Sequence, residues 1–252
     1  MNNTERKELI EKYRMATSKL VLLDYDGTLV NYETIPDNAK LPEHLANILI
    51  NLINKPQTTV FIISGRSQYD LDKFLDHLTV NIIAEHGAMI KENGTWKNQV
   101  IDNSLWKNSV LPFFNQAASD CPESFVEEKN YSLAWHYRNA DSQLAFAHSR
   151  ELIRILGKSA QTYNLKILDG NKVVEILTNE TGKGKAVKEL SQQNNYDFIL
   201  SIGDDVTDEE MFEYFRYDPH AFTVKVGNGV TSARYKLNTI DDVVSLLKHL
   251  SA

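Results

Sequence analysis

Short apolar runs alternate with amphipathic helical segments over the first third of the chain, and this alternation restricts the possible folds most strongly. Strands are expected at residues 19–23, 58–63 and 80–84. Between them, apolar residues recur at helical spacing over 42–54 and again from Leu71 to Leu78. This order is typical of a parallel sheet with helices on both faces. We therefore expect an α/β fold with a Rossmann-like parallel sheet.

The pattern changes in the middle of the chain and then returns. Hairpins are expected at 90–100 and 166–177, an antiparallel strand at 125–137 and a helix at 142–156. Helices at 183–194, 206–216 and 240–250 and strands at 198–202 and 221–226 then resume the earlier order. The α/β core is thus predicted to comprise residues 1–103 and 181–252. Residues 104–180 are predicted to form an inserted α+β domain that can lie over the edge of the core as a cap.

Composition excludes several classes of function. A net charge of −7 over 252 residues argues against a nucleic-acid partner, which would require a basic face. No apolar run approaches the ~20 residues of a membrane helix, and residues 1–19 lack the apolar segment of a signal peptide. Cys121 is the single cysteine, so no intrachain disulfide can form. We expect a cytoplasmic protein without membrane contact.

The first apolar strand ends in two carboxylates, Asp24 and Asp26, followed by Gly27. Carboxylates at the end of a buried strand are costly unless a cation compensates them. Two nearby oxygen ligands suit Mg²⁺. The alternative is a strand that merely ends in an acidic turn, and the rest of the chain has to decide between them.

Polar residues also follow three other predicted strands. Ser64-Gly65-Arg66 follows one, Glu85-His86-Gly87 the next, and Gly203 to Asp208, with three acids, follows the strand after the insert. The carboxyl ends of parallel strands meet at one edge of an open sheet, where ligands bind. A helix N-terminus explains one capping acid in the last segment, but three acids near a second acidic pair indicate a cation site.

Taken in order, these segments resemble the motifs of the haloacid dehalogenase (HAD) superfamily over nearly the whole chain. The resemblance implies that Asp24 is the nucleophile and Asp26 the general acid/base of a phosphatase. It assigns the motif III lysine to Lys183. Lys185 competes for this role by position, but the Lys-Gly-x-Ala pattern of the family selects Lys183.

The same resemblance assigns the groups that hold phosphate and metal. Ser64 and Gly65 are expected to bind phosphate together with Lys183, and Arg66 is expected to contact the substrate. The implied metal ligands are Asp24, Asp204 and the backbone carbonyl of Asp26, supported by Asp205 and Asp208. The expected cofactor is Mg²⁺.

The chemistry follows from these residue types. Asp24 can attack phosphorus in line and form a phospho-aspartate, which splits a very slow hydrolysis into two steps. Lys183 and Ser64 can stabilise the charge on the phosphoryl oxygens. Asp26 can protonate the departing alkoxide and then take a proton from water.

Segments in the middle of the chain narrow the resemblance to the trehalose-6-phosphate phosphatases. They are Glu85-His86-Gly87, the run from Leu133 to Arg138 and the run from Gly170 to Ile176. In that family the insert is a C2-type cap that binds the sugar, and the matching positions are Glu127, Lys129 and Glu175. His136 and Arg138 are equally consistent with structural or binding roles. The family's Glu-Val-[Arg/Lys]-Pro pattern is replaced here by Glu175-Ile-Leu-Thr.

Four functions stay open at this stage. The first is a Mg²⁺-dependent trehalose-6-phosphate phosphatase of trehalose biosynthesis, with a functional link to a trehalose-phosphate synthase. The second is a phosphatase for another sugar phosphate, such as sucrose phosphate or mannosyl phosphoglycerate. The third is a phosphomannomutase-like phosphotransferase, which would require a sugar bisphosphate primer. A non-catalytic partner of a synthase is the fourth, but such a domain would be expected to lose Asp24 or Asp26, and both are present.

Overall fold

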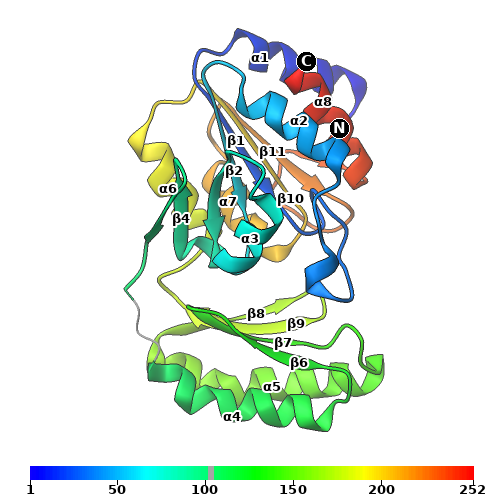
Figure 1. The fold of residues 1–252 in the computed structure, drawn as a ribbon, viewed down its shortest axis with the longest axis vertical. Coiled ribbons are helices and arrows are strands. Elements are labelled where there is room, and N and C mark those ends of the chain that lie inside the picture. The colour runs from blue at the N-terminus through cyan, green and yellow to red at the C-terminus, as the bar shows by residue number, and fades with distance from the viewer. Residues whose placement is uncertain (102–104) are drawn as a thin grey trace. The chain divides into compact units, whose positions relative to one another are not determined.

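A computed structural model describes residues 1–101 and 105–252, which divide into two compact units (Figure 1). The core unit contains Met1–Gln99 and Gly182–Ala252, and the inserted unit contains Val100–Thr181. The expected first boundary, between residues 103 and 104, lies outside the described residues. The expected second boundary, between residues 180 and 181, lies one residue before the break at Gly182.

The core unit is built on an eight-stranded sheet with the order β12-β11-β10-β1-β2-β3-β4-β5. The strands from β12 to β3 run parallel, and β4 and β5 extend the sheet as an antiparallel hairpin. This arrangement confirms the predicted α/β class with a parallel sheet. The strands are β1 (Lys19–Asp24), β2 (Thr58–Ile63), β3 (Asn81–Ala84), β4 (Met89–Glu92), β5 (Thr95–Asn98), β10 (Phe198–Gly203), β11 (Ala221–Val226) and β12 (Tyr235–Leu237).

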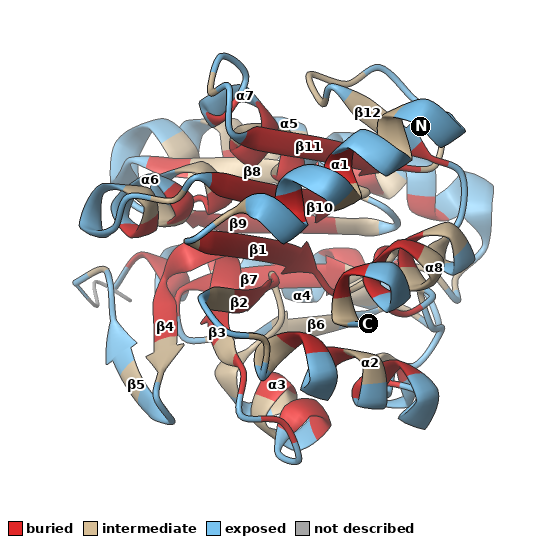
Figure 2. Ribbon diagram, turned by 90° about the horizontal axis from the view of Figure 1, so that it is seen from above, coloured by how far each residue is buried: buried red, intermediate tan, exposed pale blue. Residues whose placement is uncertain are grey.

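The central strands are buried on both faces, as Figure 2 shows for β1, β10 and β11. Leu20 and Leu22 of β1 contribute to an apolar cluster with residues of α6 and α7, and the alternate residues Val21 and Leu23 are equally buried. Two-sided burial explains why β1 is apolar at successive positions rather than at alternate ones.

Helices surround this sheet. Helices α6 and α7 pack on one face, whereas α8 contacts both α1 and α2 (Figures 1 and 2). The helices are α1 (Asn3–Met15), α2 (Glu43–Ile53), α3 (Gln68–Leu75), α6 (Lys183–Gln193), α7 (Glu209–Tyr214) and α8 (Ile240–Ser251), with short 3-10 turns at Pro36–Asn38, Glu85–Gly87 and Val206–Asp208.

The inserted unit is a four-stranded antiparallel sheet, in the order β6-β7-β9-β8, with two helices on one face. Its elements are α4 (Leu105–Asp120), β6 (Phe125–Glu128), β7 (Ser132–His136), α5 (Ser142–Tyr163), β8 (Leu165–Gly170) and β9 (Val173–Thr178). Leu133, Trp135, Val174 and Ile176 of the sheet pack against both helices. Alternate residues of the same strands therefore face away from the helices.

Three local expectations differ from the structure. Residues 125–137 form the hairpin β6–β7 rather than one strand, because the chain turns between Lys129 and Ser132. The helix expected at 206–216 begins as a 3-10 turn and becomes α-helical only at Glu209. Helix α4 is absent from the expected elements, since Pro112 inside it argues against a helix.

Across the described residues, no helix combines the length and the apolar character that crossing a membrane requires. The expected cytoplasmic location stays a prediction.

Candidate active site

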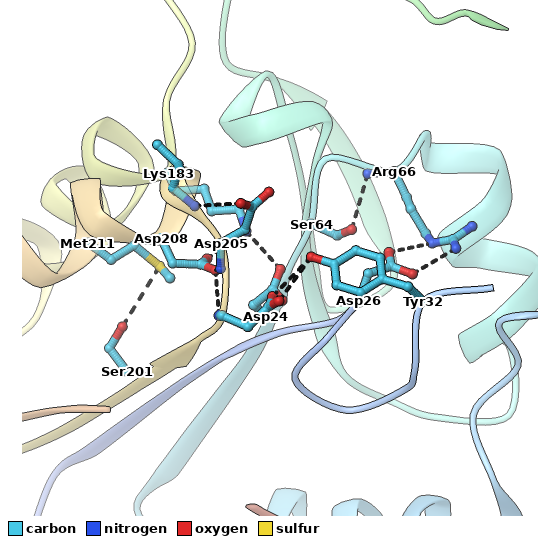
Figure 3. A network of polar contacts seen from close by, with 12 residues as sticks. Asp24, Asp26, Tyr32, Ser64, Arg66, Lys183, Ser201, Asp205, Asp208 and Met211 are labelled. Carbon is cyan, nitrogen blue, oxygen red and sulfur yellow. Dashed lines mark hydrogen bonds and ion pairs between the residues drawn. The ribbon is translucent and has the colours of Figure 1, made fainter. Parts of the chain in front are cut away.

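Four strand and helix ends of the core unit bring polar side chains together (Figure 3). Asp24 ends β1, and the two strands that pair with β1 lead directly into Ser64 and Asp204. Lys183 begins α6. The strand order thus gathers at one edge of the sheet residues that lie far apart in the sequence.

Lys183 joins two of the acids. Its Nζ atom lies 2.7 Å from Asp24 Oδ1 and 2.7 Å from Asp208 Oδ1, and all three side chains are buried. Burial by itself would lower the pKa of Lys183, but Asp208 and Asp24 raise it above its usual value. The lysine is therefore held as a cation. Lys185, the competing lysine, is exposed.

Asp208 orients this lysine and also closes the turn before it. Its Oδ2 atom accepts the backbone N–H groups of Asp204 at 2.9 Å and Asp205 at 3.0 Å. Asp205 in turn accepts the N–H of Val206 and caps the 3-10 turn. Both supporting acids therefore act on the backbone that carries Asp204.

Asp204 approaches the loop that follows β1. Gly27 has a φ of +81°, and a Cβ atom there would lie 2.2 Å from Asp204 Oδ2, so only glycine fits. The Tyr32 hydroxyl donates to Asp204 Oδ2 at 3.0 Å and Oδ1 at 3.3 Å. Burial and the nearby Asp208 raise the pKa of Asp204 to about 7.

Three of the acids lie close enough to hold a metal ion together, and one of their oxygens has no hydrogen-bond partner among the described residues. Carboxylate oxygens of Asp24, Asp204 and Asp208 lie within 4.8 Å of one another. Asp24 Oδ2 is buried and accepts no hydrogen bond from any described residue. Burial and Asp208 raise the pKa of Asp24 well above its usual value despite Lys183. An oxygen-only donor set with a buried, unsatisfied carboxylate oxygen fits a hard divalent cation.

Asp26 is held by Arg66 in a bidentate ion pair (Figure 3). Arg66 Nε lies 2.7 Å from Asp26 Oδ2, and Nη2 lies 2.8 Å from Oδ1. The third guanidinium nitrogen, Nη1, donates to the Pro36 carbonyl at 3.1 Å. The predicted substrate contact of Arg66 stays a prediction; in this structure each guanidinium nitrogen has a protein partner.

The segment Ser64–Arg66 is fastened to the turn after β3. The backbone N–H of Glu85 donates to the Arg66 carbonyl, and that of His86 donates to the Ser64 carbonyl. Glu85 and His86 both have positive φ values, 46° and 54°, and a Cβ at Gly65 would lie 2.3 Å from the His86 ring. This strained turn therefore fixes the loop that carries the buried Ser64 hydroxyl.

A second polar cluster lies in the inserted unit. Lys129 Nζ is 2.9 Å from Glu175 Oε1, and both side chains are only 6% exposed. Glu127 Oε2 is 2.7 Å from His136 Nε2. Burial would raise the pKa of Glu127, but Lys129 and His136 lower it.

The sheet register explains why this cluster forms. Glu127 pairs with Ala134, and Ala134 pairs with Glu175, so both acids point to the face turned away from α4 and α5. Ser132 lies on this face too and donates to Glu175 Oε1 at 2.5 Å. The three predicted sugar-binding residues are thus brought together in one cluster.

Two residues of these sites are not predicted from the sequence. Tyr32 and Ser132 each donate a hydroxyl to an acid that the sequence analysis singles out. No spacing or motif marks Tyr32, since its partner lies 172 positions away. Ser132 is recognisable only once β7 is paired with β9.

Comparisons with known proteins agree with this geometry. The family model described as trehalose-phosphatase matches residues 22–241. A bifunctional trehalose-6-phosphate synthase/phosphatase of Thermoproteus tenax is 39% identical over 96% of this chain and 33% of its own length. The chain spans about a third of the length of such curated relatives.

The solved structures that resemble this chain include members of the same family. The C-terminal domain of C. albicans trehalose-6-phosphate phosphatase is 29% identical with a TM-score of 0.93, covering 98% of this chain and 96% of that one. A haloacid dehalogenase-like hydrolase from B. subtilis, 17% identical with a TM-score of 0.58, covers 92% of this chain and 99% of its own and shares the fold. The chain belongs to the trehalose-phosphatase family, within the HAD fold.

Proposed function

We propose that this protein hydrolyses trehalose 6-phosphate to trehalose and phosphate with a divalent metal, Mg²⁺, at the core cluster. The observation that carries the proposal is Asp24, a buried carboxylate with one oxygen held by Lys183 and the other unsatisfied. Family membership gives the substrate, and the names of the relatives support it.

Asp24 is the proposed nucleophile. Its oxygen forms a bond to phosphorus while the bond from phosphorus to the sugar oxygen breaks, which leaves a phospho-aspartate. Water then attacks phosphorus, releases phosphate and restores the carboxylate. Lys183 keeps Asp24 in place and offers positive charge to the phosphoryl oxygens.

Asp24 and Asp204 would hold the metal through side-chain oxygens, and the Asp26 backbone carbonyl is the third predicted ligand. When bound, the cation offsets the repulsion between Asp24 and the phosphate dianion. Ser64 and Gly65 are proposed to bind a phosphate oxygen, and the backbone hydrogen bonds from Glu85 and His86 that fix this segment support the proposal.

Asp26 is the proposed general acid and base. It would give a proton to the departing sugar oxygen and later take one from the attacking water. Arg66 pairs with both oxygens of Asp26 and so fixes the orientation of the proposed general acid. Arg66 is therefore proposed to orient the general acid Asp26. A contact between Arg66 and the substrate is a separate prediction.

Glu127, Lys129 and Glu175 are proposed to recognise the sugar. Carboxylates and an ammonium group can each bind several hydroxyls, and the sheet face holds all three in fixed positions. The fusion of the two activities in the bifunctional relative supports a functional link between this protein and a trehalose-phosphate synthase.

The test is phosphate release from a panel of sugar phosphates with and without Mg²⁺. We expect trehalose 6-phosphate to have the highest kcat/KM and to need no bisphosphate primer. A preference for sucrose phosphate, or a requirement for a primer, would contradict the substrate assignment while leaving the phosphoryl-transfer residues in place.

A further inference from the structure

The Tyr32 hydroxyl is a hydrogen-bond donor within the acidic cluster that the proposed mechanism does not use. It reaches both oxygens of Asp204, at 3.0 and 3.3 Å. Tyr32 lies on the loop after β1, and Gly27 of the same loop lies so close to Asp204 that a Cβ atom there would be 2.2 Å from Asp204 Oδ2. This loop therefore binds the Asp204 carboxylate through Tyr32 and leaves space for it at Gly27.

Asp204 differs from the other two acids in its hydrogen-bond donor. Asp208 receives Lys183 and two backbone N–H groups, and Asp24 receives Lys183. Among the described residues, Tyr32 is the donor for the Asp204 side chain. Of the two carboxylates that would hold the cation, Asp204 is thus oriented by a neutral group, whereas the ammonium group of Lys183 binds Asp24 and Asp208.

A neutral donor, unlike a cation, leaves the negative charge of the carboxylate uncompensated. A phenol hydrogen bond fixes the rotation of a carboxylate without cancelling its charge, and a carboxylate has about four lone-pair directions for partners. Tyr32 can therefore retain one oxygen of Asp204 while the other oxygen binds a metal. Partners that orient metal ligands in this manner typically change metal affinity by ~10- to 100-fold when they are removed.

We propose that Tyr32 is a positioning residue for the divalent cation, which holds Asp204 in the orientation that binds metal and so sets the affinity of the site. This inference rests on the metal site of the proposed function. It concerns binding of the cation rather than a step of the reaction.

The test compares Tyr32→Phe with the wild type by direct titration of the purified protein with Mg²⁺ in a calorimeter, and with Mn²⁺ by electron paramagnetic resonance. We expect the dissociation constant to rise about 10-fold or more. Tyr13→Phe is the matched control, because its hydroxyl contacts Thr58 in the core unit and belongs to no acidic cluster. Asp204→Asn marks the loss of the site itself.

A second readout separates positioning from a general structural effect. Tyr32→Phe should require about 10-fold more Mg²⁺ for half-maximal phosphate release, yet reach a kcat close to that of the wild type at saturating Mg²⁺. A lower kcat at saturating metal, with an unchanged dissociation constant, would overturn the inference. Equal affinity in Tyr32→Phe and Tyr13→Phe would also overturn it. If the wild type binds neither metal, the metal site of the proposed function fails, and the inference fails with it.

Discussion

The two charged clusters of this protein are built on opposite principles. In the core unit, three clustered acids, Asp24, Asp204 and Asp208, are accompanied by one ammonium group, that of Lys183, which pairs with Asp24 and Asp208. A buried oxygen of Asp24 has no partner among the described residues. In the inserted unit, Glu175 pairs with Lys129, and Glu127 pairs with His136. One cluster has an excess of negative charge, and the other has a partner for each acid.

This difference shows how the same residue types serve two kinds of recognition. Burial and the neighbouring negative charge raise the pKa of Asp24 and of Asp204 in the core cluster, which favours a cation there. In the paired cluster, Lys129 and His136 lower the pKa of Glu127 and so favour its ionised form without a metal. Such a surface presents acceptors and donors to neutral hydroxyls, as a sugar requires.

The largest expected effect is that of Asp24→Asn. The amide retains the shape of the side chain but is a very weak nucleophile and a poorer metal ligand. Phosphate release from trehalose 6-phosphate should fall by at least ~10³-fold, a loss typical of removing a nucleophile. Thermal unfolding of the variant checks that the fold is intact. Retention of a tenth of the activity would contradict the phospho-aspartate mechanism.

The next largest effect is expected from metal removal, which should affect the core cluster but not the cluster of the inserted unit. Exhaustive chelation should abolish phosphate release, and Mg²⁺ should restore it. In thermal unfolding, Mg²⁺ at a hundred times its dissociation constant should stabilise the wild type by ~2.7 kcal/mol. Asp204→Asn should lose this stabilisation, whereas Glu127→Gln should keep it. Full activity after chelation would show that the acidic cluster works without a cation.

Substitutions in the polar cluster of the inserted unit should reduce the turnover of a sugar phosphate more than that of a small ester. Glu127→Ala, Lys129→Ala and Glu175→Ala should lower kcat/KM for trehalose 6-phosphate, with Glu175→Ala the most damaging at ~100-fold. Turnover of p-nitrophenyl phosphate, which lacks the sugar, should change less than about threefold, since it uses only the core residues.

The buried pair needs its own control. Breaking Lys129–Glu175 from one side leaves a buried charge and can cost ~3–5 kcal/mol of stability. The double variant Lys129→Met/Glu175→Gln removes both charges and should restore stability but not trehalose 6-phosphate turnover. Equal losses on both substrates in all variants would mean that these residues only maintain the fold.

The smallest effect is a pH dependence of opposite sign in the two clusters. Asp204 has a pKa of about 7 in the metal-free native state, against 3.8 ordinarily. Between about pH 4 and 7 the native state therefore holds protons that the unfolded chain has released, so its free energy of unfolding falls as pH rises. Glu127 has a lowered pKa, so its stabilisation is present above its ordinary value of 4.5 and is lost as pH falls further.

Urea unfolding of metal-free protein at several pH values measures both contributions. Asp204→Asn should reduce the decline between pH 4 and 7, and Asp24, whose pKa is also raised, should account for part of what remains. Glu127→Gln should instead reduce the loss of stability below pH 4.5. Identical pH profiles for the two variants would contradict the assigned directions.

The sequence by itself determines the α/β class and most of the strand ends. Apolar runs and helical spacing are local properties, and they place Asp24, Ser64 and Asp204 after strands because a parallel sheet buries both faces of its strands. The choice of Lys183 over Lys185 depends on the resemblance to the HAD family, whose Lys-Gly-x-Ala pattern matches Lys183. The hairpin β6–β7 is missed, because one alternating run cannot show where a chain reverses.

Only the tertiary structure decides which side chains meet. Lys183 and Asp24 are 159 positions apart, and Tyr32 and Asp204 are 172 apart, so no local pattern records either contact. The pairing of Asp26 with Arg66 likewise depends on how β1 and β2 lie side by side. Side-chain partners are set by packing between distant segments, whereas strands and helices follow from the periodicity of neighbouring residues.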